Sequence, residues 1–101
     1  MPHRIYVYEN VPFFAKVQLS GNRAPLKIRI DYETEAGDLC IYGSTVDREP
    51  SEKASEYVYK KNPKQIKLTD FEGASALYLA LISETGVKIT VHVQFGTLTL
   101  N

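Results

Sequence analysis

The sequence predicts an all-β fold: a single antiparallel β-sandwich of the jelly-roll kind, with about eight strands. Three observations lead to this prediction. Apolar and polar residues alternate with a period of two in several segments, as in strands that bury one face. Turn signals that contain Gly, Asn or Pro recur at short intervals. No segment shows the periodicity of an amphipathic helix, which argues against a fold of alternating strands and helices.

Four segments carry the strongest strand signals. In residues 26–34 the even positions are apolar or β-branched, and the odd positions up to Glu33 are all charged. Residues 87–95 and 13–19 show the same alternation, which is typical of strands with one solvent-facing side. Residues 76–82 are apolar, or tyrosine, at every position. We expect this run to form a central strand.

The connections between strands can also be predicted. Residues 83–86 form a short link that contains Gly86, so we expect residues 76–95 to form one hairpin. Shorter strands are expected at residues 5–8, 39–42, 57–59 and 64–68. Turn signals lie at residues 21–25, 36–38, 61–63 and 72–73. The tail, residues 97–101, is either a last half-strand or a loose end.

Composition limits the classes of protein to consider. A chain of 101 residues with 44% hydrophobic and 24% charged residues is predicted to fold as one domain, residues 1–101. Twelve basic residues balance twelve acidic ones, so no global field favours binding to nucleic acid. Cys40 is alone and favours a reducing compartment. The first nine residues lack the apolar run of a signal peptide, and no stretch is long enough for a membrane helix. We therefore expect a soluble, cytoplasmic protein.

Catalytic signals are sparse. The candidates are His3, His92, Cys40 and scattered carboxylates, without the spacing of a zinc site or a redox motif. We interpret His92 as an exposed neighbour on the polar face of its strand, and Cys40 as a small packing residue. The prediction is a non-enzyme without a cofactor, and a small hydrolase built on His92 is kept as a weaker alternative.

The candidate contact region follows the fourth predicted strand. Residues 43–55 form a long charged loop, and loops of this length in compact domains are often functional. A strip of lysines comes next, and it could hold an acidic peptide, a phosphorylated partner or a lipid headgroup. Lysines on an edge strand also discourage aggregation, so both interpretations stay open. The candidate partner-binding residues are Asp47, Arg48, Glu49, Tyr57, Tyr59, Lys60, Lys61, Lys64 and Lys67.

A group of acidic residues suggests an alternative site. Asp31, Glu35 and Asp38 lie around the turn after the strand at 26–34, and loops at one end of a sandwich can supply the oxygen ligands of calcium. The spacing differs from that of an EF-hand. A solvated strand face is the competing interpretation, because Asp31 and Glu33 alternate with apolar residues.

Part of the chain resembles a known family. The segment 28–44, with Gly-Asp-Leu-Cys-Ile-Tyr-Gly-Ser at residues 37–44 and the charged loop with Pro50-Ser51 after it, resembles the pre-peptidase C-terminal type of β-sandwich. Residues 76–81, the turn at Gly86 and the strand 87–95 are similar to that family's closing hairpin. Cys40 departs from the pattern, because the family often has an Asp there. The resemblance implies an accessory, non-catalytic module, since such domains assist the attachment or maturation of secreted enzymes.

These observations together predict a function. We expect a non-catalytic protein-interaction module that acts within a larger intracellular assembly and contacts a partner with an acidic surface or tail. The alternative is an accessory module that binds lipid or carbohydrate in a calcium-dependent way. Self-association through the exposed sheet edges is left open.

Overall fold

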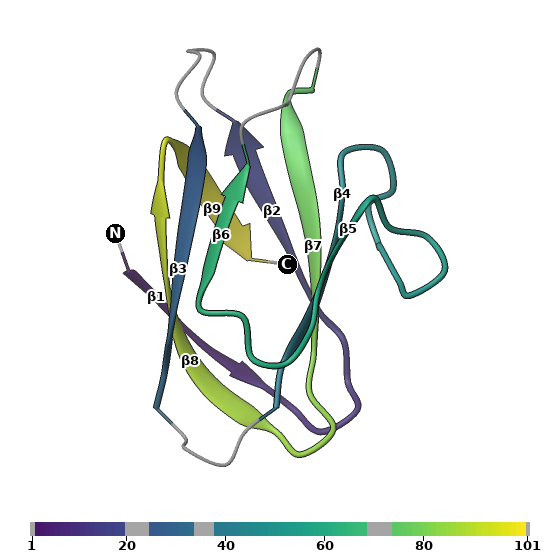
Figure 1. Cartoon of the computed structure of the whole chain (residues 1–101), viewed down its shortest axis with the longest axis vertical. Coiled ribbons are helices and arrows are strands. Elements are labelled where there is room, and N and C mark those ends of the chain that lie inside the picture. The colour runs from purple at the N-terminus through teal and green to yellow at the C-terminus, as the bar shows by residue number, and fades with distance from the viewer. Residues whose placement is uncertain (1, 20–24, 34–37, 69–73, 101) are drawn as a thin grey trace.

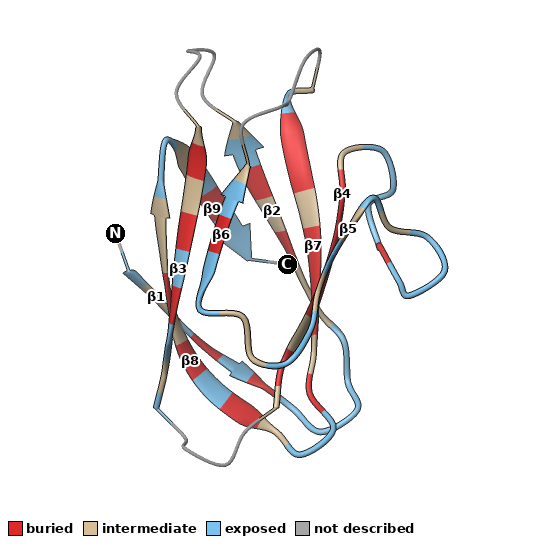
Figure 2. Ribbon diagram, viewed as in Figure 1, coloured by how far each residue is buried: buried red, intermediate tan, exposed pale blue. Residues whose placement is uncertain are grey.

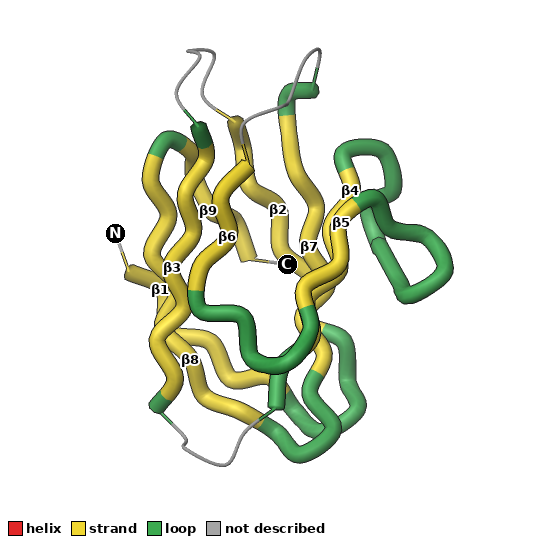
Figure 3. The backbone as a smooth tube through the Cα atoms, viewed as in Figure 1, coloured by secondary structure: helices red, strands yellow, loops and turns green. Residues whose placement is uncertain are grey.

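The computed structural model describes residues 2–19, 25–33, 38–68 and 74–100, and within these ranges the chain forms two facing β-sheets (Figure 1). Strands and loops account for all of the described residues, with no helix among them (Figure 3). The described strands are β1 (Pro2–Val7), β2 (Phe13–Leu19), β3 (Leu26–Tyr32), β4 (Cys40–Ser44), β5 (Tyr57–Tyr59), β6 (Gln65–Leu68), β7 (Ala76–Ile82), β8 (Val87–Gln94) and β9 (Gly96–Leu100).

The order of the strands is that of a jelly roll. One sheet has four strands in the order β1-β8-β3-β6, and the other has five in the order β5-β4-β7-β2-β9. All the paired strands are antiparallel. The first eight strands form two four-stranded sheets in the winding of a double-sheet jelly roll, and β9 is added beside β2. The predicted fold class is therefore confirmed.

A single hydrophobic core lies between the sheets. In β3 the buried residues are Leu26, Ile28 and Ile30, while the charged residues between them point outward, as the alternation predicts. β8 and β1 add their own alternating residues from the same sheet, and β2, β4, β7 and β9 supply the opposite wall. The bands of buried residues along the strands in Figure 2 follow this pattern.

The predicted hairpin at residues 76–95 is wrong. β7 lies in the five-stranded sheet and β8 in the four-stranded sheet, so residues 83–86 cross from one sheet to the other. Both edges of β7 are occupied by β2 and β4, and both edges of β8 by β1 and β3. The two strands therefore have no free edge to offer each other. Gly86 makes this crossing with φ at +84°, a conformation that glycine adopts without strain.

The tail forms a complete strand. β9 pairs with β2 from Gly96 to Leu100, and Leu98 is buried against the core. The chain passes from β8 to β9 through Phe95, which has a positive φ, and Gly96. A side chain at Gly96 would come within 3.0 Å of Leu26 and Val17, which explains why glycine stands there. The turns predicted at residues 21–24, 36–37 and 72–73 lie outside the described residues.

Candidate binding surfaces

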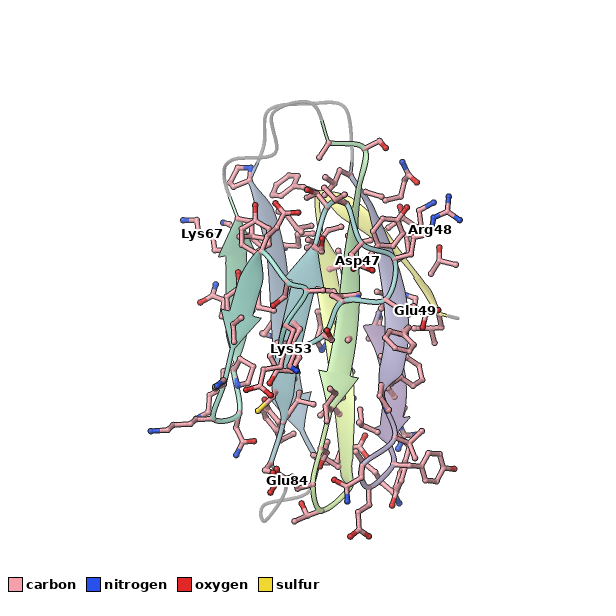
Figure 4. The ribbon with its side chains drawn as sticks, turned by 90° about the vertical axis from the view of Figure 1, so that its right-hand side faces the viewer. Asp47, Arg48, Glu49, Lys53, Lys67 and Glu84 are labelled. Atoms are coloured by element: carbon pink, nitrogen blue, oxygen red, sulfur yellow. The ribbon has the colours of Figure 1, made fainter. Side chains whose placement is uncertain are left out.

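The charged segment between β4 and β5, residues 45–56, folds back over the outer face of the five-stranded sheet and is called here the covering loop (Figure 4). Pro50 in this loop is fully buried. Beneath it, Tyr42 and Ala80 point away from the core, and yet Tyr42 is 7% exposed and Ala80 is 0% exposed. Burial, followed by Cys40 and then Glu52 of this loop, raises the pKa of the Tyr42 phenol. The part of this face formed by β4 and β7 is thus closed to solvent.

Hydrogen bonds hold both ends of the covering loop. Oε1 of Glu56 accepts hydrogen bonds from the Thr45 hydroxyl (2.7 Å), the Thr45 amide (2.8 Å) and the Ser44 hydroxyl (3.2 Å). These bonds, led by that from the Thr45 side chain, lower the pKa of Glu56 below its ordinary value of 4.5. The Ser44 hydroxyl in turn accepts from the amides of Val46 and Asp47. The loop is built as a fixed element.

The first group of predicted contact residues lies on this loop. Asp47, Arg48 and Glu49 are all exposed, and Oδ1 of Asp47 accepts a hydrogen bond from the amide of Glu49. Together with Glu52, Lys53 and Glu56 they give the loop more acidic than basic groups. Figure 4 shows Asp47, Arg48 and Glu49 over the five-stranded sheet, away from Lys67 on β6. These three loop residues and Lys67 therefore do not form one surface.

The predicted contact tyrosines face the core. Tyr57 and Tyr59 alternate with exposed Val58 along β5, and both are half-buried against the hydrophobic cluster. Burial, followed by the neighbouring Tyr57, raises the pKa of the Tyr59 phenol. The alternation in Tyr-Val-Tyr was a signal that both rings share the inner face.

The four predicted lysines, called here the basic strip, are Lys60, Lys61, Lys64 and Lys67, and all are exposed. They run from the end of β5 through the connection into β6, and β5 and β6 are the edge strands of their two sheets. Within the described part of the chain, none of them takes part in an ion pair. The strip is therefore a concentrated positive charge at a sheet edge.

The connection that carries the strip is fixed by three contacts. The Tyr32 hydroxyl donates to the carbonyl oxygen of Pro63 (2.5 Å), the amide of Leu39 donates to Oδ1 of Asn62 (2.6 Å), and the amide of Ile30 donates to the carbonyl of Lys64 (2.9 Å). Burial, and then Cys40, raises the pKa of Tyr32 to about 12. Lys61 is held at φ +62°, a left-handed conformation that costs a non-glycine residue roughly 1 kcal/mol.

Two further cations on the outer face of β3, Lys27 and Arg29, extend the basic region. Lys27 lies directly opposite Lys67 in the β3–β6 register, and Arg29 lies opposite Gln65. Periodicity had placed Lys27 and Arg29 on the outer face of β3. It could not identify their neighbours, because the pairing of β3 with β6 joins segments far apart in the sequence.

Two residues of the alternative calcium site, Asp31 and Asp38, have other hydrogen-bond and ion-pair partners. Asp38 accepts hydrogen bonds from Ser83, Glu84 and Thr85, and these bonds, led by that from the Thr85 hydroxyl, lower its pKa. Asp31 instead contacts Arg29 and His92 on the outer face of β3. Glu35 lies outside the described residues. Among the residues that the structure describes, no three His, Cys, Asp or Glu side chains come together as a metal site.

The candidate catalytic residues are scattered. Nε2 of His92 lies 2.9 Å from Oδ2 of Asp31, on the outer face of the four-stranded sheet. His3 is half-buried on the edge strand β1, and Cys40 is a half-buried free thiol in the other sheet. The depression beside His92 is lined by basic and amide side chains, without a serine, threonine or cysteine among its described lining residues.

In the comparisons with known proteins, no protein family matches the chain, and no curated protein is significantly similar to it. The resemblance to the pre-peptidase C-terminal sandwich thus stays a prediction. In the described part of the chain, no helix has the length and hydrophobicity needed to cross a membrane.

Proposed function

We propose that the protein is a non-catalytic interaction module whose basic strip binds an acidic segment of another protein. One observation carries the proposal. Lys67 lies directly opposite Lys27 at the edge of the four-stranded sheet, and among the described residues no carboxylate pairs with either. Like charges in opposite positions destabilise a sheet. A bound acidic group removes that repulsion.

The edge strand β6 also offers backbone groups to a partner. The amide of Ile30 bonds to the carbonyl of Lys64, so these two residues form a hydrogen-bonded pair. In an antiparallel ladder such pairs alternate with non-bonded pairs, which places Gln65 and Lys67 in non-bonded pairs with β3. Their N–H and C=O groups therefore point to the free edge, where an extended peptide can add as a further strand.

The charge pattern sets the chemistry of the peptide. In an added strand every second side chain points to the outer face, the face that carries Lys27, Lys67 and Arg29. A peptide with Glu or Asp at every second position places its carboxylates beside these cations. Such contacts between exposed charges are sensitive to salt.

The test uses a synthetic peptide that alternates glutamate with threonine. We expect it to bind with a Kd in the micromolar range, roughly, at low salt, and to lose affinity as salt is added. The double variant Lys27→Glu/Lys67→Glu is expected to weaken binding by at least about tenfold, because it removes two attractive charges from the outer face and adds two repulsive ones. Fluorescence anisotropy measures both.

The matched control is Arg48→Glu/Lys53→Glu on the covering loop. It changes the net charge equally but on the other side of the molecule, so binding is expected to stay within about twofold. Equal losses in the two double variants would show that only net charge matters. The absence of binding by the wild type would reject the proposal and leave the strip as protection against edge-to-edge aggregation.

A further inference from the structure

A depression of about 430 Å³ opens on the outer face of the four-stranded sheet. Its polar lining consists of Lys27, Arg29, Gln65, His92 and Gln94, with Pro2 beside them. The register explains why they gather, because Pro2, His92, Arg29 and Gln65 occupy one row across the four strands, and Lys27 and Gln94 are paired in the next row. Every lining residue lies in a strand, so the shape of the depression is set by the sheet before any ligand binds.

The two ends of this face differ in how their charges are used. At the far end, Arg4 contacts both carboxylate oxygens of Glu33 (3.2 and 3.3 Å), and the ammonium of Lys88 lies 5.7 Å from the ring centre of Tyr6. Beside the depression, Oδ2 of Asp31 lies 3.5 Å from Nη2 of Arg29 and 2.9 Å from Nε2 of His92, so both side chains share one carboxylate oxygen. Lys27 has no ion-pair partner among the described residues. The depression therefore keeps an excess of positive charge.

The depression offers more hydrogen-bond donors than the carboxylate of Asp31 can accept from. Lys27, Arg29 and the two glutamine amides all donate hydrogen bonds, and Arg side chains favour phosphate and carboxylate groups. Asp31 already supplies a planar carboxylate at the rim. A tetrahedral group with three free oxygens matches the remaining donors. Lys27 and Arg29 against Asp31 leave one positive charge, and a positive charge on His92 would make it two, equal to the charge of a phosphate dianion.

His92 adds a variable charge. An ionised carboxylate only accepts hydrogen bonds, so the contact with Asp31 requires the proton of the neutral ring to sit on Nε2. Uptake of a second proton makes the ring a cation beside the depression. The charged groups that face it are Arg29, Asp31 and Lys27 from β3 and Arg4 from β1.

We infer that this depression is a binding site for the dianionic phosphate group of a phosphate monoester, with Arg29 as the principal contact, Lys27 and His92 as supporting cations, and the two glutamines as neutral donors. The site is open to solvent, so the remainder of the ligand can extend away from the sheet. The site shares Lys27 and Arg29 with the outer face that we propose receives the acidic peptide, but its ligand is a different one, a phosphate dianion.

The experiment titrates the full chain with inorganic phosphate and with O-phosphoserine, followed by NMR of the backbone amides and of the Arg29 and His92 side chains. Both probes are expected to saturate with a Kd in the millimolar range, roughly, and to shift these side chains together. Tighter binding of O-phosphoserine would identify an ester rather than free phosphate as the ligand. Acetate is the probe for a site that takes any carboxylate, and binding of acetate as tight as that of phosphate would overturn the assignment.

Two variants with matched charge test the location. Arg29→Gln is expected to weaken phosphate binding by at least about tenfold, because it removes two or more charge-assisted hydrogen bonds. Arg4→Gln removes the same charge from the same face but lies in the Glu33 pair, and we expect a change within about twofold. Equal losses in the two variants, or no saturation by phosphate, would overturn the inference.

Sulfate isolates the role of His92, because sulfate keeps both charges across the pH range in which phosphate titrates. We expect the wild type to bind sulfate about fivefold more tightly at about pH 6 than at about pH 8. His92→Gln is expected to bind with no such pH dependence, and the same dependence in this variant would contradict the role given to His92. Binding of the acidic peptide is read separately, so failure of this site and failure of the strip are distinguishable.

Discussion

The two outer faces of the sandwich differ in composition and in how far the chain itself covers them. The face of the five-stranded sheet carries small or apolar residues such as Ala80 and Tyr42, and the chain covers it with its own loop and the buried ring of Pro50. The face of the four-stranded sheet carries charged residues and has no such cover among the described residues (Figure 2). A division thus exists between a partly covered face, whose buried residues contribute to stability, and a face that is open to solvent.

The sharpest test places the same charge on each face. Ala80→Lys puts an ammonium under the covering loop, and we expect it to cost about 3 kcal/mol or more, because the charge is buried without a partner. Thr90→Lys, at the middle of the open face near Asp31 and Glu33, is expected to stay within about 1 kcal/mol. Urea unfolding followed by circular dichroism measures both, and equal costs would refute the division.

A second test removes the anchor of the covering loop. Pro50→Ser takes a buried apolar ring out of the face, with an expected cost of about 1 to 3 kcal/mol. The loosened loop should also be cleaved by trypsin at Arg48 and Lys53 faster than in the wild type. Val46→Ser is the control in the same loop, because Val46 is 83% exposed. If Val46→Ser accelerates cleavage equally, Pro50 is not the anchor.

A third test uses acid. The pKa of Glu56 is lower in the folded state than in the unfolded chain, so its contribution to stability is present above the unfolded pKa and is lost as pH falls through the folded pKa. Glu56→Gln is expected to be less stable than the wild type at neutral pH, by less than Pro50→Ser, and equal to it at about pH 2. Glu49→Gln removes the same charge from the loop as a control. A difference that persists unchanged in acid would contradict the assignment.

The smallest effect is expected on the open face. Lys67→Gln removes one of two lysines that lie opposite each other, and we expect a gain of a few tenths of a kcal/mol, roughly. Lys64→Gln is the control, because its register neighbour is the uncharged Ile30. Careful comparison of denaturation midpoints, with the slope unchanged, measures the difference. A loss of stability in Lys67→Gln would mean that Lys67 is a structural residue.

The positions of most strands, and the residues on their buried faces, could be predicted from the sequence. The pairing of one strand with another could not. The alternation correctly predicted the buried residues Leu26, Ile28 and Ile30 of β3 and Val87, Ile89 and Val91 of β8, because period two depends only on local geometry. It was wrong at the end of the second of these strands, where Phe95 has a positive φ and is 46% exposed. It could not predict that β7 and β8 belong to different sheets, since a short connection with Gly86 suits a hairpin and a crossing equally well. Within the candidate site, the lysines of the strip were visible in the sequence. Their pairing with Lys27 was not, because register across β3 and β6 is a property of the whole fold.

The burial of Pro50 in the covering loop could not be predicted from the sequence. Its composition is that of a solvated loop, and a single proline among charged residues gives no sign that it will be buried. The inward orientation of Tyr57 and Tyr59 could have been predicted from the sequence. Their alternation with Val58 puts both rings on one face of β5, and burial of that face removes more apolar area from water than burial of the face with Val58.

The jelly-roll winding has a consequence for how the protein acquires its shape. β1 forms its sheet with β8, so residues near 2 must find residues near 92. Pairings this distant close very long loops, and folds dominated by them form in milliseconds to seconds rather than microseconds. During synthesis, β1 and β3 have no strand between them until β8 has left the ribosome. Until then, the edges of β1 and β3 that β8 will occupy stay unpaired, and unpaired strand edges promote aggregation.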